Sequence, residues 1–93
     1  MSIPAYAGPD NTTPAVLQGV NARDLGFDFY IASTTNPMGC SQPTIFRVAN
    51  SMSNKEAMVA TLLSAFATQR QVSVYVHNCD SDGASLVASV RMY

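Results

Sequence analysis

The stretch Val72-Ser73-Val74-Tyr75-Val76-His77 decides the fold, because apolar and polar side chains alternate in it without a break. A period of two predicts a strand whose three valines turn inward and whose other three side chains turn outward. Asp80-Ser81-Asp82-Gly83 follows as a tight polar turn. A last strand then alternates an inward set with an outward set, namely Leu86, Ala88, Val90 and Met92 with Val87, Ser89 and Arg91. These two strands are expected to form a hairpin.

A helix is expected ahead of this hairpin, from Ser53 to about Arg70. Its start fits the capping box Ser53-Asn54-Lys55-Glu56, in which the Ser hydroxyl and the Glu carboxylate satisfy each other's free backbone N–H groups. Apolar residues then recur at the spacing of one helix face, which are Val59, Leu62, Leu63 and Phe66, with Met58 and Ala65 at its edge. This face should cover a sheet or the mouth of a barrel.

Three strands are expected in the first half of the chain. The first spans residues 15–20, where Gly19 suits a bulge or a sharp bend; the second spans 27–32, with Phe27, Phe29 and Ile31 inward; the third spans 44–49. Residues 33–43 form a loop, and residues 1–13 form an extended N-terminal arm ahead of a single domain at 14–93. Five antiparallel strands with a helix between the third and fourth give the order of an OB-fold barrel, so the fold class is mainly β with one helix.

Composition excludes several classes of partner. A chain of 93 residues holds one core, and exported domains of this size commonly add disulfides or oligomerise. Five Lys and Arg against six Asp and Glu, scattered singly, give a net charge of −1 and no stripe that could neutralise a phosphate backbone, so nucleic acid is not an expected partner. No apolar run approaches the roughly 18 residues of a membrane span, and no membrane insertion is expected.

Cys40 and Cys79 lie too far apart for a C-x-x-C redox or zinc motif, and each lies beside turn residues. In an exported protein they would pair; otherwise they would be free thiols or, less often, a redox pair. We expect a structural disulfide, for which the chain-entropy model gives roughly 4 kcal/mol. Only 12% of the chain is charged, which gives a surface typical of proteins outside the reducing cytosol, so a secreted or periplasmic location is expected.

No motif predicts catalysis. His77 is the only histidine, and neither a nucleophile motif nor a second ligand accompanies it, so no triad, zinc site or cofactor is expected and the chain is predicted not to be an enzyme. Asp80 and Asp82 share a turn, whose chemistry explains both, and the other ligands of a calcium loop are missing. An outward polar and aromatic group remains, suited to a sugar because sugar C–H faces stack on rings and sugar hydroxyls need hydrogen-bond partners. Its members are Tyr30, Ser73, Tyr75, His77 and Asn78.

The run from Leu62 to Gln71, followed at once by Val72–Val76, by Cys79 and by a final apolar strand, resembles the B subunits of bacterial A-B toxins of the pertussis-like and subtilase-cytotoxin-like group. The resemblance covers roughly the last half of the chain. It implies an OB-fold, export, a homo-oligomeric ring of five subunits, recognition of host-cell glycans on the barrel side, and a separate catalytic A subunit. The chain departs from the group in its compact N-terminal half and in having two cysteines, and none of the five surface residues above is carried over from the family.

Three functional hypotheses follow. The first is a secreted, glycan-binding, ring-forming delivery subunit of a bacterial toxin. The second is a periplasmic or secreted protein-interaction or inhibitor module, which pairs an exposed sheet edge with a strand of its partner. The third is a small enzyme that depends on His77. Capture of one stoichiometric protein partner would favour the second over the first.

Overall fold

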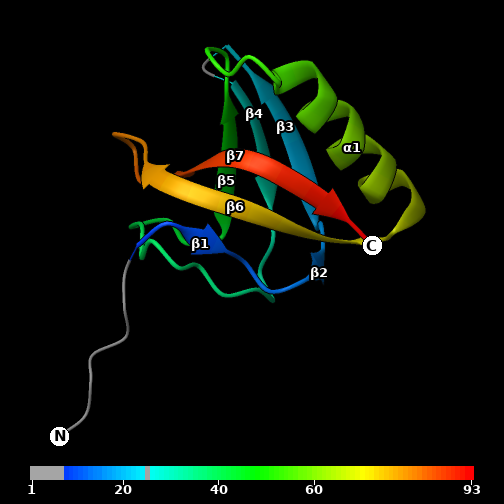
Figure 1. Cartoon of the computed structure of the whole chain (residues 1–93), viewed down its shortest axis with the longest axis horizontal. Coiled ribbons are helices and arrows are strands. Elements are labelled where there is room, and N and C mark those ends of the chain that lie inside the picture. The colour runs from blue at the N-terminus through cyan, green and yellow to red at the C-terminus, as the bar shows by residue number, and fades with distance from the viewer. Residues whose placement is uncertain (1–7, 25) are drawn as a thin grey trace, which may run out of the picture.

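The structure is a computed structural model that describes residues 8–24 and 26–93 (Figure 1). Residues 1–7 of the expected arm lie outside this range. The described elements are β1 (Asp10–Asn11), β2 (Ala15–Val16), β3 (Gly19–Arg23), β4 (Gly26–Tyr30), β5 (Ile45–Ala49), α1 (Lys55–Thr68), β6 (Gln71–Cys79) and β7 (Ser85–Met92).

One mixed sheet holds these strands together. β3, β4 and β5 form an antiparallel meander, β6 and β7 form an antiparallel hairpin, and β5 pairs in parallel with β7. The hydrogen-bonded order is β1-β6-β7-β5-β4-β3, with β2 also paired to β6, and it does not close on itself within the described residues. Figure 1 shows the hairpin crossing in front of the meander, with α1 to one side of both. The protein is a small, mainly β domain with one helix.

The expectation of five antiparallel strands is corrected in two respects. Within the described residues there are seven strands, and one pairing is parallel. The predicted first strand is split at Leu17 and Gln18, because β2 pairs with β6 whereas β3 pairs with β4. Between them Leu17 is buried, and the Gln18 N–H donates to the Tyr30 carbonyl at 2.8 Å. The additional strand β1 comes from the expected arm, since Asp10 and Asn11 pair with β6.

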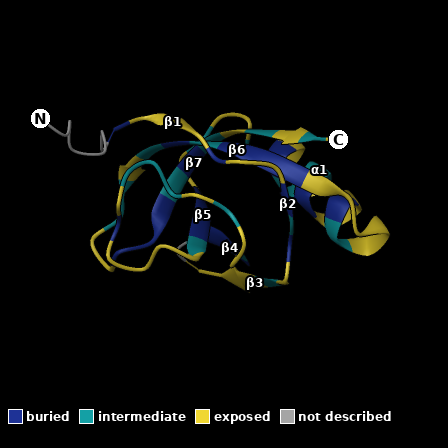
Figure 2. Cartoon of the chain, turned by 90° about the horizontal axis from the view of Figure 1, so that it is seen from below, coloured by how far each residue is buried: buried dark blue, intermediate teal, exposed yellow. Residues whose placement is uncertain are grey.

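The core lies between the meander and the hairpin, with the buried face of α1 packed against it from one side (Figure 2). The predicted alternation in β6 is confirmed, since its three valines are fully buried. The inward set of β4 is confirmed as well. The main core side chains are Phe27, Phe29, Ile31, Phe46, Val48, Met58, Leu62, Ala65, Val72, Val74, Val76 and Val87.

The helix differs from its prediction at its start and in its buried face. It begins at Lys55 after the N-cap Asn54, which makes no side-chain capping bond, so the capping box at Ser53 is not formed. The Asn54 amide instead donates to the Ala88 carbonyl of β7 at 3.1 Å. Leu62 of the predicted face is fully buried together with Met58 and Ala65 of its edge, and Val59 and Phe66 pack partly buried against the core. Leu63, expected inside, is instead 45% exposed.

The last strand changes face partway along. Tyr75 pairs with Ser89, but the next residue, Val76, pairs with Val87, so Ala88 is left as an extra residue in β7. Such a bulge inverts the inward and outward sets beyond it. Val87, expected outside, is therefore fully buried, whereas Val90 packs against the core from the inward set as predicted.

Candidate functional site

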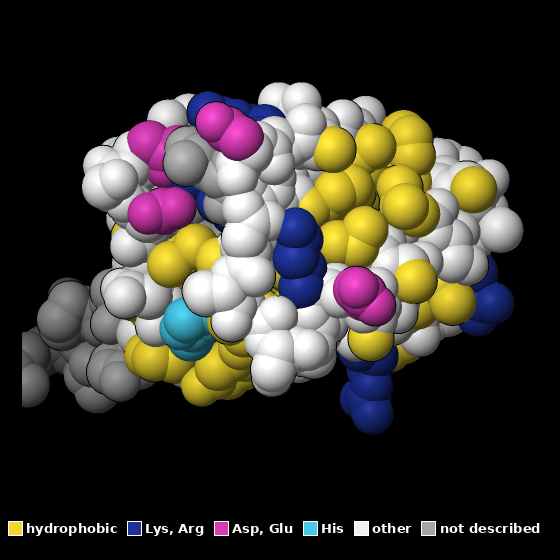
Figure 3. All heavy atoms as spheres, turned by 90° about the horizontal axis from the view of Figure 1, so that it is seen from above, with side chains coloured by type: hydrophobic (Ala, Val, Ile, Leu, Met, Phe, Trp, Pro, Cys, Tyr) yellow, Lys and Arg dark blue, Asp and Glu magenta, His cyan; other side chains and the backbone are white. Residues whose placement is uncertain are grey.

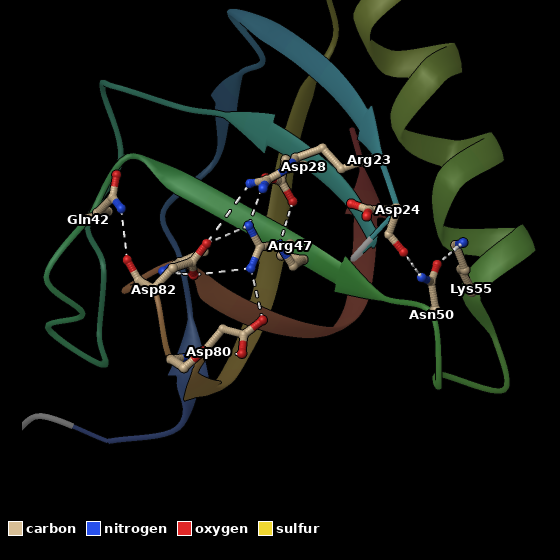
Figure 4. Close-up of polar contacts among 11 residues, drawn as sticks. Arg23, Asp24, Asp28, Gln42, Arg47, Asn50, Lys55, Asp80 and Asp82 are labelled. Atoms are coloured by element: carbon tan, nitrogen blue, oxygen red, sulfur yellow. Dashed lines mark hydrogen bonds and ion pairs between the residues drawn. The ribbon is translucent and has the colours of Figure 1, made fainter.

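The outward side of β4 and β5 carries a buried arginine at the centre of an ion cluster (Figure 4). The Arg47 side chain is 1% exposed. Its Nε and Nη2 donate to the two carboxylate oxygens of Asp28 at 2.7 and 3.0 Å. Nη1 donates to Asp80 at 2.8 Å and to Asp82 at 3.1 Å, and Nη2 also donates to Asp82 at 2.9 Å. The five N–H groups of a guanidinium are thus all used, and none is left for a ligand.

The charges of this cluster are fixed rather than exchangeable. Hydrogen bonds from Arg47 lower the pKa of Asp80 and of Asp82 below the usual aspartate value. The hydrogen bonds that Arg47 donates, first to Asp28 and then to Asp82, raise the pKa of Arg47. Arg23 lies at the rim, with its Nη1 3.4 Å from a carboxylate oxygen of Asp28. Because these pKa shifts hold the groups in their charged forms near neutral pH, the cluster is unsuited to general acid or base catalysis.

What the cluster does is hold the turn between β6 and β7 against β4 and β5. The interpretation that turn chemistry alone explains Asp80 and Asp82 is therefore wrong. Asp28, on the face of its strand opposite the inward Phe27 and Phe29, is buried as well. Burial of Asp28 is possible because two hydrogen bonds from Arg47 satisfy its carboxylate.

The loop at residues 32–44 is bonded to the same turn between β6 and β7, on the side away from the ion cluster. The predicted disulfide between Cys40 and Cys79 is present, with Cα atoms 5.6 Å apart. Gln42 adds two hydrogen bonds, from its backbone N–H to the Gly83 carbonyl at 3.1 Å and from its amide to the Asp82 carbonyl at 2.8 Å. This end of the domain is therefore structural.

A second candidate surface is the outer face of β1, β6 and β7. On β6, the side chains of Ser73, Tyr75 and His77 lie opposite the buried valines. Tyr75 pairs across the sheet with Asn11 on one side and Ser89 on the other. A groove of about 530 Å³ crosses this face, and the residues that line it are Asn11, Thr12, Pro14, Ser73, Ser89, Val90, Arg91 and Tyr93.

The floor and the rim of this groove differ in their freedom to bind. The floor is occupied by internal bonds, since the Ser73 hydroxyl donates to the Thr12 carbonyl and the Thr12 hydroxyl accepts from the Val74 N–H. The rim carries exposed side chains of Asn11, Ser89 and Arg91. The groove thus offers an amide, a hydroxyl and a guanidinium at its rim.

An aromatic ring completes the rim, because Tyr93 is 48% exposed and lines the groove. The backbone beside this ring is fixed, since the Tyr93 N–H donates to the Gln71 carbonyl at 2.9 Å and the Tyr93 carbonyl accepts from Arg70. The backbone that carries the ring is thus fixed, and the exposed ring can present a face to a ligand.

The structure brings together part of the predicted ligand-binding set. Ser73 lines the groove but is only 7% exposed, so its predicted outward hydroxyl lies beneath β1. Tyr75 and His77 are half-buried on the same face, and Asn78 is exposed next to the disulfide, where its side chain accepts from the Cys79 N–H. Tyr30 lies apart, on β4, whose paired strands are β3 and β5.

Four rim residues were missed by the sequence prediction. Ser89 and Arg91 were expected to point outward, so alternation placed them on this face but gave no reason to prefer them. Asn11 was hidden because the arm was not expected to pair with β6, and Tyr93 follows the last expected strand residue. Arg47 was missed because a charged residue in a strand of apolar residues gives no sign of its partners until the turn is placed beside it.

Comparison with known protein families, curated proteins and solved structures finds no match for this chain. Among residues 8–24 and 26–93, no group of three or more His, Cys, Asp or Glu side chains is arranged to hold a metal ion. In the same residues, no helix has the length and apolarity needed to cross a membrane.

Proposed function

We propose that this protein is a secreted carbohydrate-binding domain, and that the groove on the outer face of β1, β6 and β7 is its sugar site. The observation that carries the proposal is the composition of the groove rim. An amide, a hydroxyl and a guanidinium surround a hollow of about 530 Å³, and an exposed tyrosine ring lies at its border. This size falls within the range of about 300–1,000 Å³ that is typical of small-molecule sites.

Sugar chemistry matches this rim better than other small molecules do. Each sugar hydroxyl both donates and accepts a hydrogen bond, which suits the amide of Asn11 and the hydroxyl of Ser89. The C–H face of a pyranose stacks on an aromatic ring, which suits Tyr93. Arg91 adds a donor set that favours a sugar with a carboxylate or with adjacent hydroxyls.

We also propose that the domain is an OB-fold-like open barrel. The supporting observations are the meander β3–β4–β5, a helix, and then the hairpin β6–β7, with β5 parallel to β7. β2 and β3 follow each other along the chain, and β2 pairs with β6 of the hairpin whereas β3 pairs with β4 of the meander. Together they connect the hairpin to the far side of the meander, as the first strand of a barrel does. This is the connectivity expected of five OB-fold strands if β2 and β3 count as one bent strand.

Export is supported by the disulfide, since such bonds persist in oxidising compartments. The role of a toxin delivery subunit, with a ring of five copies and a catalytic A subunit as partner, derives from the resemblance of the last half of the chain. The sugar-binding proposal does not depend on that role.

A glycan array screened with the purified, oxidised protein tests the proposal, followed by titration calorimetry on the best sugar. Tyr93→Ala and Arg91→Ala are expected to weaken binding at least about tenfold, because each removes a rim group. Asn21→Ala is the matched control, since Asn21 is exposed on β3, away from the groove, and should leave affinity unchanged. Absence of any glycan ligand, or equal affinity in all three variants, would refute the site. Capture of one stoichiometric protein partner would instead favour the interaction module.

A further inference from the structure

Helix α1 leaves an apolar surface uncovered on the side away from the core. Leu63 is 45% exposed at the middle of the helix, and Ala60 and Ala67 are exposed on either side of it. A shallow hollow of about 370 Å³ lies against this surface, lined by Lys55, Glu56, Val59, Ala60 and Leu63. Figure 3 shows hydrophobic side chains gathered at the side of the molecule where Figure 1 places α1, with acidic and basic side chains beside them.

The exposed residues form a stripe with the spacing of a helix–helix seam. Glu56, Ala60, Leu63 and Ala67 follow one another at steps of four, three and four residues. These steps repeat every seven residues, which is the pattern by which one helix packs along another. The core-facing residues Met58, Leu62 and Ala65 lie on a different side of the helix, so the stripe is additional to the face that builds the fold.

We propose that this stripe is the contact surface for a second copy of the same chain, with the two α1 helices antiparallel about a two-fold axis near Leu63. A two-fold contact is self-complementary, so every residue must meet an acceptable partner from its own stripe. Leu63 then meets Leu63 of the second copy, and Ala60 meets Ala67. The small alanines let the two helices approach closely around the central leucines.

The charges near the two ends of α1 favour this occupant over an unrelated one. Glu56 lies at the start of the helix and Arg70 just beyond the left-handed Gln69 that ends it, so the antiparallel arrangement brings each Glu56 near an Arg70 of the other copy. Among the described residues, neither side chain takes part in an ion pair within its own chain, and Arg70 uses only its Nε, in a hydrogen bond to the Tyr93 carbonyl. One chain thus supplies both the acid and the base that a second copy needs.

The contact is expected to be weak. A helix of 14 residues is about 21 Å long at the usual rise per residue. One such helix pair buries less than the roughly 800 Å² per partner of a standard stable interface. The dimer should therefore form in the micromolar range or above, and it should depend strongly on protein concentration.

Sedimentation velocity over a concentration series, on the full oxidised chain, tests the pairing. Leu63→Glu is expected to raise the dimer dissociation constant at least about tenfold, because it places two carboxylates on the two-fold axis. Thr68→Glu is the matched control, since it adds the same charge at an exposed position off the stripe and should leave the dimer intact. Circular dichroism should be unchanged in both variants, because neither residue is buried.

A charge exchange tests the antiparallel geometry itself. Glu56→Arg and Arg70→Glu should each weaken the dimer, because each places like charges together, whereas the double exchange should restore it. A wild-type protein that stays monomeric up to several hundred micromolar, or a mass of five chains unaffected by Leu63→Glu, would overturn the inference. So would a double exchange that fails to restore the dimer, or a monomer that binds a different protein through Leu63. The glycan titration is independent of the Leu63→Glu and Thr68→Glu outcomes, because the groove and α1 share no residue. The Arg70 exchange is read by sedimentation alone, since Arg70 donates to the carbonyl of the groove residue Tyr93.

Discussion

The two ends of the domain are held together by different means. At the turn end, a disulfide, a buried guanidinium with five hydrogen bonds and two bonds from Gln42 secure the turn between β6 and β7. At the helix end, α1 is held by apolar packing of one face, and its other face exposes Leu63. Every strong bond at the turn end is made within the chain, whereas the helix end leaves surface for another molecule.

This difference follows from the size of the chain. A domain of 93 residues buries a limited apolar area, so directional bonds at one end can stabilise what the core does not reach. The turn end contains loops with little apolar surface, and there the ion cluster and the disulfide substitute for packing. Changes at the turn end should therefore cost far more stability than changes on the exposed side of α1.

The largest effect is expected from Arg47→Ala. Removal of the guanidinium leaves Asp28 buried without a partner inside the domain apart from the rim contact with Arg23, and it releases both aspartates of the turn. Breaking a buried ion pair in this way costs about 3–5 kcal/mol. Urea unfolding followed by circular dichroism measures the loss.

Arg23→Ala is the control for that experiment. Its side chain is 38% exposed and lies 3.4 Å from Asp28, so its removal should cost less than about 1 kcal/mol. Equal losses in the two variants would mean that the cluster acts through its total charge rather than through the buried geometry of Arg47.

Loss of the disulfide should come next. The bond joins residues 39 positions apart, and the chain-entropy model gives about 4 kcal/mol for a loop of that size. The Cys40→Ser/Cys79→Ser double variant should therefore unfold at markedly lower urea concentration than the wild type. Reductant should produce a similar fall in the wild type and no further fall in the double variant. A variant as stable as the wild type would show that the ion cluster alone holds the turn.

A smaller effect is expected from Gly83→Ala, with Gly39→Ala as its matched comparison. Both glycines have positive φ, +96° and +66°, so a Cβ strains either backbone by about 1–2 kcal/mol. Only Gly83 is also crowded, because its new Cβ would lie 2.0 Å from the Ser41 hydroxyl and 3.3 Å from the Gln42 nitrogen. Thermal unfolding should therefore show a larger fall for Gly83→Ala. The reverse order would indicate that the loop does not press on the turn.

Much of the fold could be predicted from the sequence where a single period dominates. The valines of β6 and the aromatic residues of β4 gave their strands and their inward faces, and Cys40 and Cys79 gave the crosslink. The helix was also predicted, within two residues of each end. Of its predicted buried face only Leu63 was misplaced, because apolar residues occupy several sides of α1 and the pattern does not say which of them meet the core.

Features that depend on pairing between distant strands could not be predicted in this way. The bulge at Ala88 inverts the faces of β7, and nothing local to that strand marks it. The predicted first strand is split because its first residues pair with β6 and its last residues pair with β4. The candidate groove could be predicted only in part for the same reason. The outward residues of β6 were clear from the alternation, but Asn11 and Arg91 come to lie beside them only through strand pairing.

The smallest expected effect is the response of the turn end to acid. Hydrogen bonds from Arg47 lower the pKa of Asp80 and of Asp82 in the folded protein, so the folded state binds fewer protons there than the unfolded chain, whose aspartates titrate near about 3.9. Stability from these contacts is therefore complete above about pH 5 and is lost as the pH falls through about 4 towards the folded pKa values.

Urea midpoints measured from pH 7 to pH 2.5 should be level at first and then fall. The Asp80→Asn/Asp82→Asn variant should start lower at pH 7 and fall less below pH 4, because it has no carboxylates in the turn left to protonate. If the urea midpoints of the two proteins fell in parallel with pH, the acid-sensitive groups would lie outside the turn. The ion cluster would then not distinguish the turn end from the helix end.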